Sequence, residues 1–144
     1  MTQIDFHFNA RERLQYTCRL LRKVHAQALR VGVVGSEASL RQLDVALWSF
    51  SEASFLPHST AADDPEIQQA SPIRLHGDPD QLSGMDVLVN LGDEVPPGFD
   101  AFPRLVEIVA TDEHGRMMAR QRWRHYTHQG YALIQHDLSK LEAS

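Results

Sequence analysis

The chain has 144 residues, of which 42% are hydrophobic and 23% charged, and its formal net charge at pH 7 is -5. These values are typical of one soluble globular domain with its own core, and no apolar run approaches the ~18 residues that span a bilayer. The acidic total argues against a general nucleic-acid binder, because such proteins gain most of their affinity by neutralising phosphates.

The N-terminal region predicts a strand followed by a helix. Residues 3–8 alternate between apolar and polar side chains, which is typical of a short strand. Asn9 followed by Glu12 predicts an N-cap and its reciprocal partner at the start of a helix. Cys18 lies on the inward stripe of that helix, where we expect a structural thiol. A single cysteine and the lack of a secretory signal indicate a cytoplasmic protein.

The next segment repeats this order. The apolar run 31–35, bounded by glycine, predicts a buried parallel strand, and Ser36 or Ser39 caps a helix whose apolar positions reach Trp48. Strand, helix, strand, helix in this order indicates a βαβ layout. The glycines form no phosphate-binding loop, since the chain has neither Gly-x-Gly-x-x-Gly after the first strand nor Gly-Lys-Ser or Gly-Lys-Thr. A nucleotide-binding or hydrolytic enzyme on a Rossmann-like fold is the alternative hypothesis. Without a phosphate-binding loop, it depends only on the analogy of the predicted fold.

The second half of the chain continues the α/β pattern. Residues 59–72 and 92–103 are polar or rich in proline and predict exposed loops. Further strands are predicted at residues 73–75, 86–91, 105–109 and 131–134. We expect one α/β domain over residues 1–136, with a mostly parallel central sheet flanked by helices in a Rossmann-like three-layer arrangement. Residues 137–144 are expected to form a loosely held tail.

A helix capped by Thr111 or Asp112 carries the most distinctive chemistry. Between residues 116 and 124 it holds four of the chain's 14 Lys+Arg. At roughly 100° per residue, one arc of about 100° groups its cationic and aromatic side chains, and another side suits core contact. The first set is Arg116, Arg120, Trp123, Arg124 and Thr127, and the second is Met118, Ala119 and Tyr126. Gly130 predicts the helix end, with Tyr131 just beyond it.

Guanidinium groups beside an aromatic plane favour a ligand that has carboxylates and one apolar group. We therefore predict a docking site on this helix and no catalytic residue. The alternative is a solvated charged face with Trp123 packed against the sheet. The apolar set Trp48, Phe50, Phe55 and Leu56 has a similar pair of interpretations: ordinary core, or an exposed patch that contacts another protein.

Other chemistry finds little support in the sequence. His125 and His128 lie three residues apart, but no HExxH pattern, cysteine pair or carboxylate at ligand spacing accompanies them, so we expect no metal site and no cofactor. A Gly-x-Ser-x-Gly nucleophile motif is absent, and the paired loop aspartates are expected to be solvated.

Two segments are more specific than their composition alone. The first is Leu43-Asp44-Val45-Ala46-Leu47-Trp48, continuing to Ser54-Phe55-Leu56-Pro57-His58, and the second is residues 119–126 with Gly130-Tyr131. Together they resemble the signature of the chi subunit of bacterial DNA polymerase III holoenzyme. Chain length, the opening strand and helix, and the order of elements fit as well. The resemblance covers essentially the whole chain.

The resemblance implies a single α/β domain without enzymatic activity. Chi-like proteins pair with the psi subunit, which ties them to the clamp loader, and bind the acidic C-terminal tail of single-stranded DNA-binding protein. It leaves open whether a helicase shares the psi-facing patch, and it implies no direct contact with nucleic acid or membrane. Carried over by motif position, the tail site is Arg120, Trp123, Arg124, Gly130 and Tyr131. The psi-facing patch is Trp48, Phe55 and Val109, the last from a weakly matching segment.

Overall fold

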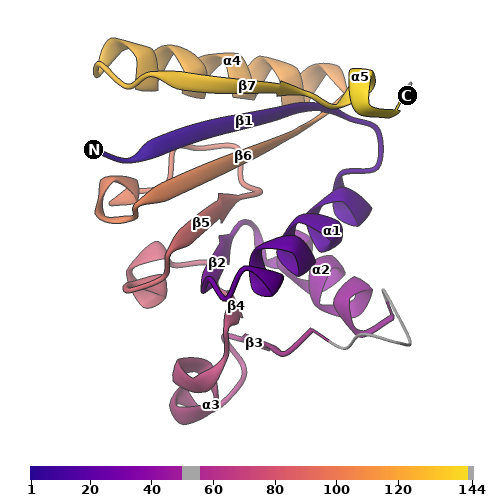
Figure 1. The fold of residues 1–144 in the computed structure, drawn as a ribbon, viewed down its shortest axis with the longest axis vertical. Helices are drawn as coiled ribbons and strands as arrows, with labels where there is room; N and C mark the ends of the chain where they lie inside the picture. Colours follow the sequence, from indigo (N-terminus) through magenta and orange to yellow (C-terminus); the bar gives the residue numbers. More distant parts are fainter. Residues whose placement is uncertain (50–55, 143–144) are drawn as a thin grey trace.

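Seven parallel strands form one sheet in the computed structural model, which describes residues 1–49 and 56–142. Their order across the sheet is β3-β4-β2-β5-β6-β1-β7 (Figure 1). The strands are β1 (Gln3–Ala10), β2 (Val31–Val34), β3 (His58–Thr60), β4 (Ile73–Leu75), β5 (Val87–Asn90), β6 (Arg104–Ala110) and β7 (Leu133–Asp137). The helices are α1 (Arg13–Ala26), α2 (Glu37–Ser49), α3 (Pro65–Ala70), α4 (Glu113–His128) and α5 (Leu138–Glu142), with two short 3-10 turns, η1 (Pro79–Leu82) and η2 (Phe99–Ala101).

Two layers of helices cover the two faces of this sheet, which confirms the predicted α/β class. Side chains alternate along a strand, so neighbours in sequence enter different cores. In β6, Val106 and Ile108 pack with α1 and α2, whereas Leu105 and Val109 pack with α4 and η2. The alternation of side chains along β6 therefore determines which of its residues lie under α4.

Local capping fixes the ends of two helices as the sequence predicted. The Oγ of Ser36 accepts a hydrogen bond from the amide of Ser39 at 3.1 Å, at the start of α2. The carboxylate of Asp112 accepts one from the amide of Gly115 at 2.8 Å, at the start of α4. Both bonds satisfy amides that have no partner inside the helix.

The end of α4 at Gly130 is also confirmed. Gly130 has φ +92°, its amide donates to the carbonyl of Thr127, and the amide of Tyr131 donates to the carbonyl of Tyr126. This pair of bonds around a left-handed residue is a Schellman motif, and glycine adopts that conformation without a Cβ penalty.

The predicted role of Asn9 as an N-cap is wrong. Asn9 lies in β1 with φ 63°, and its side-chain amide donates to the Oδ1 of Asp137 at 2.9 Å. Helix α1 begins at Arg13, and Glu12 at the N-cap position makes no side-chain cap bond. Asn tolerates the left-handed conformation better than most residues, and in this conformation its side chain bonds to β7 and does not cap α1.

Two segments hold more structure than predicted. The expected loop 59–72 contains the last residues of β3 and all of α3, elements too short to show a period in sequence. Asp137, where the expected tail begins, is the last residue of β7. Leu138 follows it in α5 and is buried in the core. No described helix is long and apolar enough to cross a membrane.

Candidate functional site

A hollow of about 560 Å³ opens between α4 and the carboxyl ends of β1 and β6. This volume is within the roughly 300–1,000 Å³ of ordinary ligand pockets. The sheet supplies a mainly apolar floor and α4 supplies an aromatic wall and two guanidinium groups. The lining residues are Phe6, Phe8, Asn9, Val109, Ala110, Arg116, Ala119, Arg120, Trp123 and Gln135.

Trp123 is anchored on the sheet but is not enclosed by it. Its ring meets Phe6 edge-on, with centroids 5.0 Å apart. The residue remains half-buried and lines the hollow. Packing on Phe6 limits the rotamers of the indole, so an apolar ligand group would meet a fixed aromatic surface.

Cationic groups border this apolar space. Arg116 and Arg120 are one helical turn apart and therefore lie on one side of α4, and Arg124 continues the row. All three are exposed, and Arg116 donates from Nη2 to the Oδ1 of Asn9 at 3.3 Å. Within the described residues, no carboxylate forms an ion pair with any of the three, so their charges are available to an anionic ligand.

Arg122, the fourth cation of this segment, has a different role. It is 5% exposed, and its Nε donates to the buried carboxylate of Glu107 in β6 at 3.0 Å. Its Nη1 donates to the carbonyl of Asp93 at 2.9 Å. Tyr126 donates to Glu107 at 2.6 Å, and the side-chain amide of Asn90 lies 3.1 Å from each carboxylate oxygen. This network attaches the middle of α4 to β5 and β6.

Burial controls the ionisation of this network. Burial raises the pKa of Glu107, against the guanidinium of Arg122 and the donated hydrogen bonds, which lower it. Burial and the neighbouring Glu107 raise the pKa of Tyr126, so its hydroxyl remains a donor at neutral pH. The network was not predicted from the sequence, although one signal of it was present. Glu107 lies within the apolar strand 105–109, and a carboxylate buried there needs a buried partner.

The remaining residues of the predicted tail site lie further along α4. Gly130 and Tyr131 follow the helix end, roughly 15 Å from Arg120 at 1.5 Å per residue. Tyr131 is half-buried, and its ring packs against Phe99 with centroids 5.3 Å apart. The structure therefore brings Arg120 and Trp123 together at the hollow and puts Gly130 and Tyr131 at the other end of the helix. An extended peptide of about five residues would span that distance.

A second surface lies on α2. Trp48 is 64% exposed and Val45, one turn earlier on the same side, is 63% exposed. The ring of Trp48 meets His58 edge-on at 5.2 Å. Phe55, predicted to share this patch, lies outside the described residues.

The structure does not bring Val109 together with Trp48. Val109 is 4% exposed and lines the hollow under α4, whereas α2 packs on the other face of the sheet. The alternation of side chains along β6 accounts for the difference, because Val109 faces the same side as Leu105.

A smaller hollow of about 310 Å³ lies at the carboxyl ends of β5 and β6. Arg13, which lines it, donates to the carbonyls of Leu91 and Ile108 at 3.3 and 3.5 Å. Asp93 and Asp112 contribute carboxylates to the same lining, and Arg13 and Arg122 contribute guanidinium groups. Both guanidinium groups already donate to protein oxygens, and the two carboxylates offset their charge. This hollow therefore gives no support to the nucleotide hypothesis.

Comparisons with known proteins agree on one family. The family model described as "DNA polymerase III chi subunit, HolC" matches residues 1–134. The DNA polymerase III subunit chi of Pseudomonas aeruginosa is 36% identical over 146 residues, which cover 98% of this chain and 100% of that protein. The DNA polymerase III subunit chi of Haemophilus influenzae is 28% identical over 99 residues, or 68% of this chain and 67% of that protein.

Proposed function

Because this chain belongs to the DNA polymerase III chi subunit family, we propose that it is a non-catalytic adaptor of the holoenzyme in the cytoplasm. In this proposal it binds the acidic C-terminal tail of single-stranded DNA-binding protein through α4, and the psi subunit through α2. The psi subunit in turn ties it to the clamp loader. The observation that carries the proposal is the apolar hollow bordered by guanidinium groups that have no internal ion pair among the described residues.

The proposed ligand has the chemistry that this hollow can recognise. On the family resemblance, the tail ends in an apolar aromatic residue with a free carboxylate, preceded by aspartates. The aromatic side chain would enter the hollow against the exposed part of Trp123 and over Phe8, and Arg120 would bind the terminal carboxylate through two parallel hydrogen bonds. Arg124, on the side of Arg120 toward Gly130, would meet the preceding aspartates, and Arg116, one turn to the other side, would add positive charge around the terminal carboxylate.

Gly130 and Tyr131 would contact an upstream part of the same peptide. An extended chain that follows α4 from the hollow reaches the helix end within about five residues. The peptide therefore lies along the helix in this proposal, and the two ends of the predicted site belong to one ligand.

A calorimetric titration with a synthetic tail peptide tests the proposal. We expect the peptide with a free C-terminus to bind at least about tenfold more tightly than the amidated peptide, because a charge-assisted bond is worth roughly 1.5–3 kcal/mol. Arg120→Ala should weaken binding by a similar factor. Arg41→Ala is the matched control, since Arg41 is an exposed arginine on α2. Equal affinity for the two peptides would exclude carboxylate capture.

The adaptor role further requires two partners that do not compete. The Val45 and Trp48 patch and the α4 hollow are on helices that cover opposite faces of the sheet. Trp48→Ala should abolish co-purification with the psi subunit and leave the affinity for the tail peptide unchanged, because the side chain is 64% exposed. A tail peptide that displaces the psi subunit would contradict the adaptor role.

A further inference from the structure

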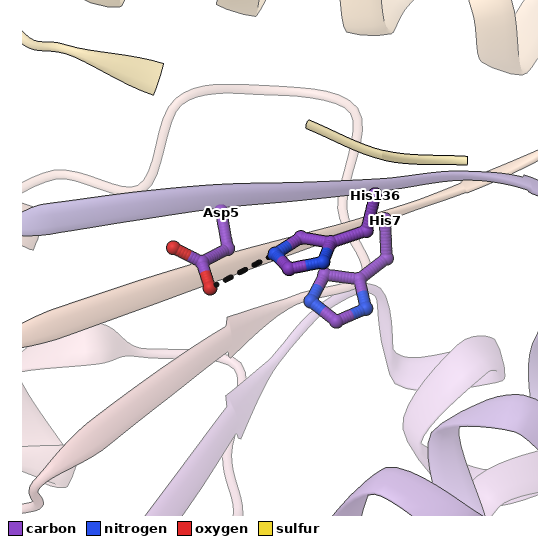
Figure 2. A group of neighbouring side chains, drawn as sticks. All are labelled: Asp5, His7 and His136. Atoms are coloured by element: carbon purple, nitrogen blue, oxygen red, sulfur yellow. Dashed lines mark ion pairs between the residues drawn. The ribbon is translucent and has the colours of Figure 1, made fainter. Parts of the chain in front are cut away.

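Three potential metal ligands meet on the two strands at one edge of the sheet. Strands β1 and β7 are parallel neighbours, and their register pairs His7 with His136. Asp5 precedes His7 by two residues, so its side chain points to the same face. Oxygen and nitrogen atoms of Asp5, His7 and His136 lie within 4.8 Å of one another (Figure 2).

We propose that Asp5, His7 and His136 bind one divalent transition-metal ion of the zinc class. Two imidazoles and one carboxylate are a ligand set that such ions prefer, and three protein ligands leave a position for water. The carboxylate of Asp5 points toward the ring of His136 (Figure 2). An ion held between them would replace their direct contact.

His136 has an unsatisfied nitrogen at the centre of this group. Its Nε2 is buried and has no hydrogen-bond partner among the described residues. This Nε2 lies 3.3 Å from the Oδ2 of Asp5. The two atoms form an ion pair only when the imidazole ring is protonated. Buried polar atoms normally have partners, so this nitrogen is available as a ligand.

A hydrogen bond orients the second histidine, His7. His7 Nδ1 forms a hydrogen bond with the hydroxyl of Tyr16. That contact occupies one ring nitrogen and leaves Nε2 for an ion, as in many metal sites where a second group orients the ligating ring.

Access and positioning also fit this site. Asp5 is 3% exposed, and its Oδ1 accepts a hydrogen bond from Gln3 at 3.1 Å. The side chain of His136 is 39% exposed, so an ion reaches the group from solvent. The guanidinium group of Arg104 lies 3.3 Å from the Oδ2 of Asp5, and its positive charge opposes the binding of a cation. The side chain of Arg104 is 36% exposed, however, and has room to turn outward.

Titration of the untagged, metal-free chain with Zn²⁺ tests the proposal, with Co²⁺ as the spectroscopic probe. We expect one ion per chain and micromolar affinity. His136→Ala and Asp5→Asn should each weaken binding at least about tenfold, and Tyr16→Phe about tenfold through the orienting contact. His128→Ala, at an exposed histidine on α4, is the matched control and should bind as the unchanged chain does.

Circular dichroism and urea denaturation of each variant separate lost binding from lost folding. NMR of the imidazole nitrogens gives a second, independent result: Zn²⁺ should shift His7 and His136 and leave His125 and His128 unchanged. Absence of binding by the unchanged chain would overturn the proposal. So would a folded His136→Ala variant that binds with undiminished affinity.

Discussion

Arg122 on α4 donates from Nε to the Oε1 of Glu107 on β6 across 3.0 Å, and both side chains are almost fully buried. This contact sets the rotation of α4 about its axis. With Arg122 facing the sheet, Arg120 and Arg124, two residues to either side, are turned outward. One arginine is therefore structural, and its neighbours are available to a ligand.

Replacement of Arg122 should destabilise the fold strongly. Arg122→Ala leaves the carboxylate of Glu107 buried without its cation, which typically costs about 3–5 kcal/mol. Urea denaturation should show this loss in the free energy of unfolding. Arg120→Ala, at an exposed position of the same helix, should change it by less than about 0.5 kcal/mol. Equal effects of the two substitutions would contradict the assigned roles.

Stability should fall as the pH is lowered from 6.5 to 4, because of His7. Its pKa is lowered from 6.5 to about 4 in the folded chain, so the unfolded chain binds more protons within this range. The stabilisation is complete above pH 6.5 and is lost as the pH falls through the folded pKa. We expect the free energy of unfolding to fall by roughly 2 kcal/mol over this range. The full pKa shift corresponds to a larger loss, but the adjoining His136 is solvent-accessible and solvent screens part of the effect.

The causes of the His7 shift define the control for this measurement. After burial, His136, Arg104 and Lys23 lower the pKa, and Asp5 raises it. Urea denaturation at a series of pH values should show a shallower slope between pH 4 and 6.5 for His7→Gln. The slope for His128→Ala should match that of the unchanged chain. A slope unaffected by His7→Gln would assign the acid sensitivity to other groups.

Gly130→Ala should cost about 1–2 kcal/mol of folding stability, since φ is +92° and a Cβ disfavours the left-handed region. No heavy atom lies within 4 Å of the added Cβ, so the cost comes from the backbone and not from a clash. Gly77→Ala is the control: its Cβ would meet only a backbone oxygen of Gly35, at 3.8 Å. Thermal denaturation that ranks Gly77→Ala as the worse variant would contradict this role.

Binding of the tail peptide should weaken several-fold between low and high salt. The guanidinium groups of Arg116, Arg120 and Arg124 are exposed, and ions screen exposed charges over about 10 Å at 0.1 M. Calorimetry at several NaCl concentrations measures this dependence, and a peptide with its aspartates changed to asparagine should show a smaller one. An affinity independent of salt would indicate that the apolar hollow alone binds the peptide.

The sequence itself determined the order of the strands and helices other than β3, α3 and α5. It also determined the caps at Ser36 and Asp112 and the stop at Gly130. Each depends on hydrogen bonds or periodicity within a few residues, so local physics was sufficient. The short β3 and α3 offered too few residues for any period to appear, and they were missed.

Only the tertiary structure decided which residues act together. Parallel pairing of β1 with β7 brings His7 beside His136, and pairing of β5 with β6 brings Asn90 beside Glu107. The sheet face on which α4 packs likewise decided that Val109 lies beneath the hollow and apart from Trp48. Such contacts join residues far apart along the chain, and a pattern within one segment carries no information about its partner across the sheet.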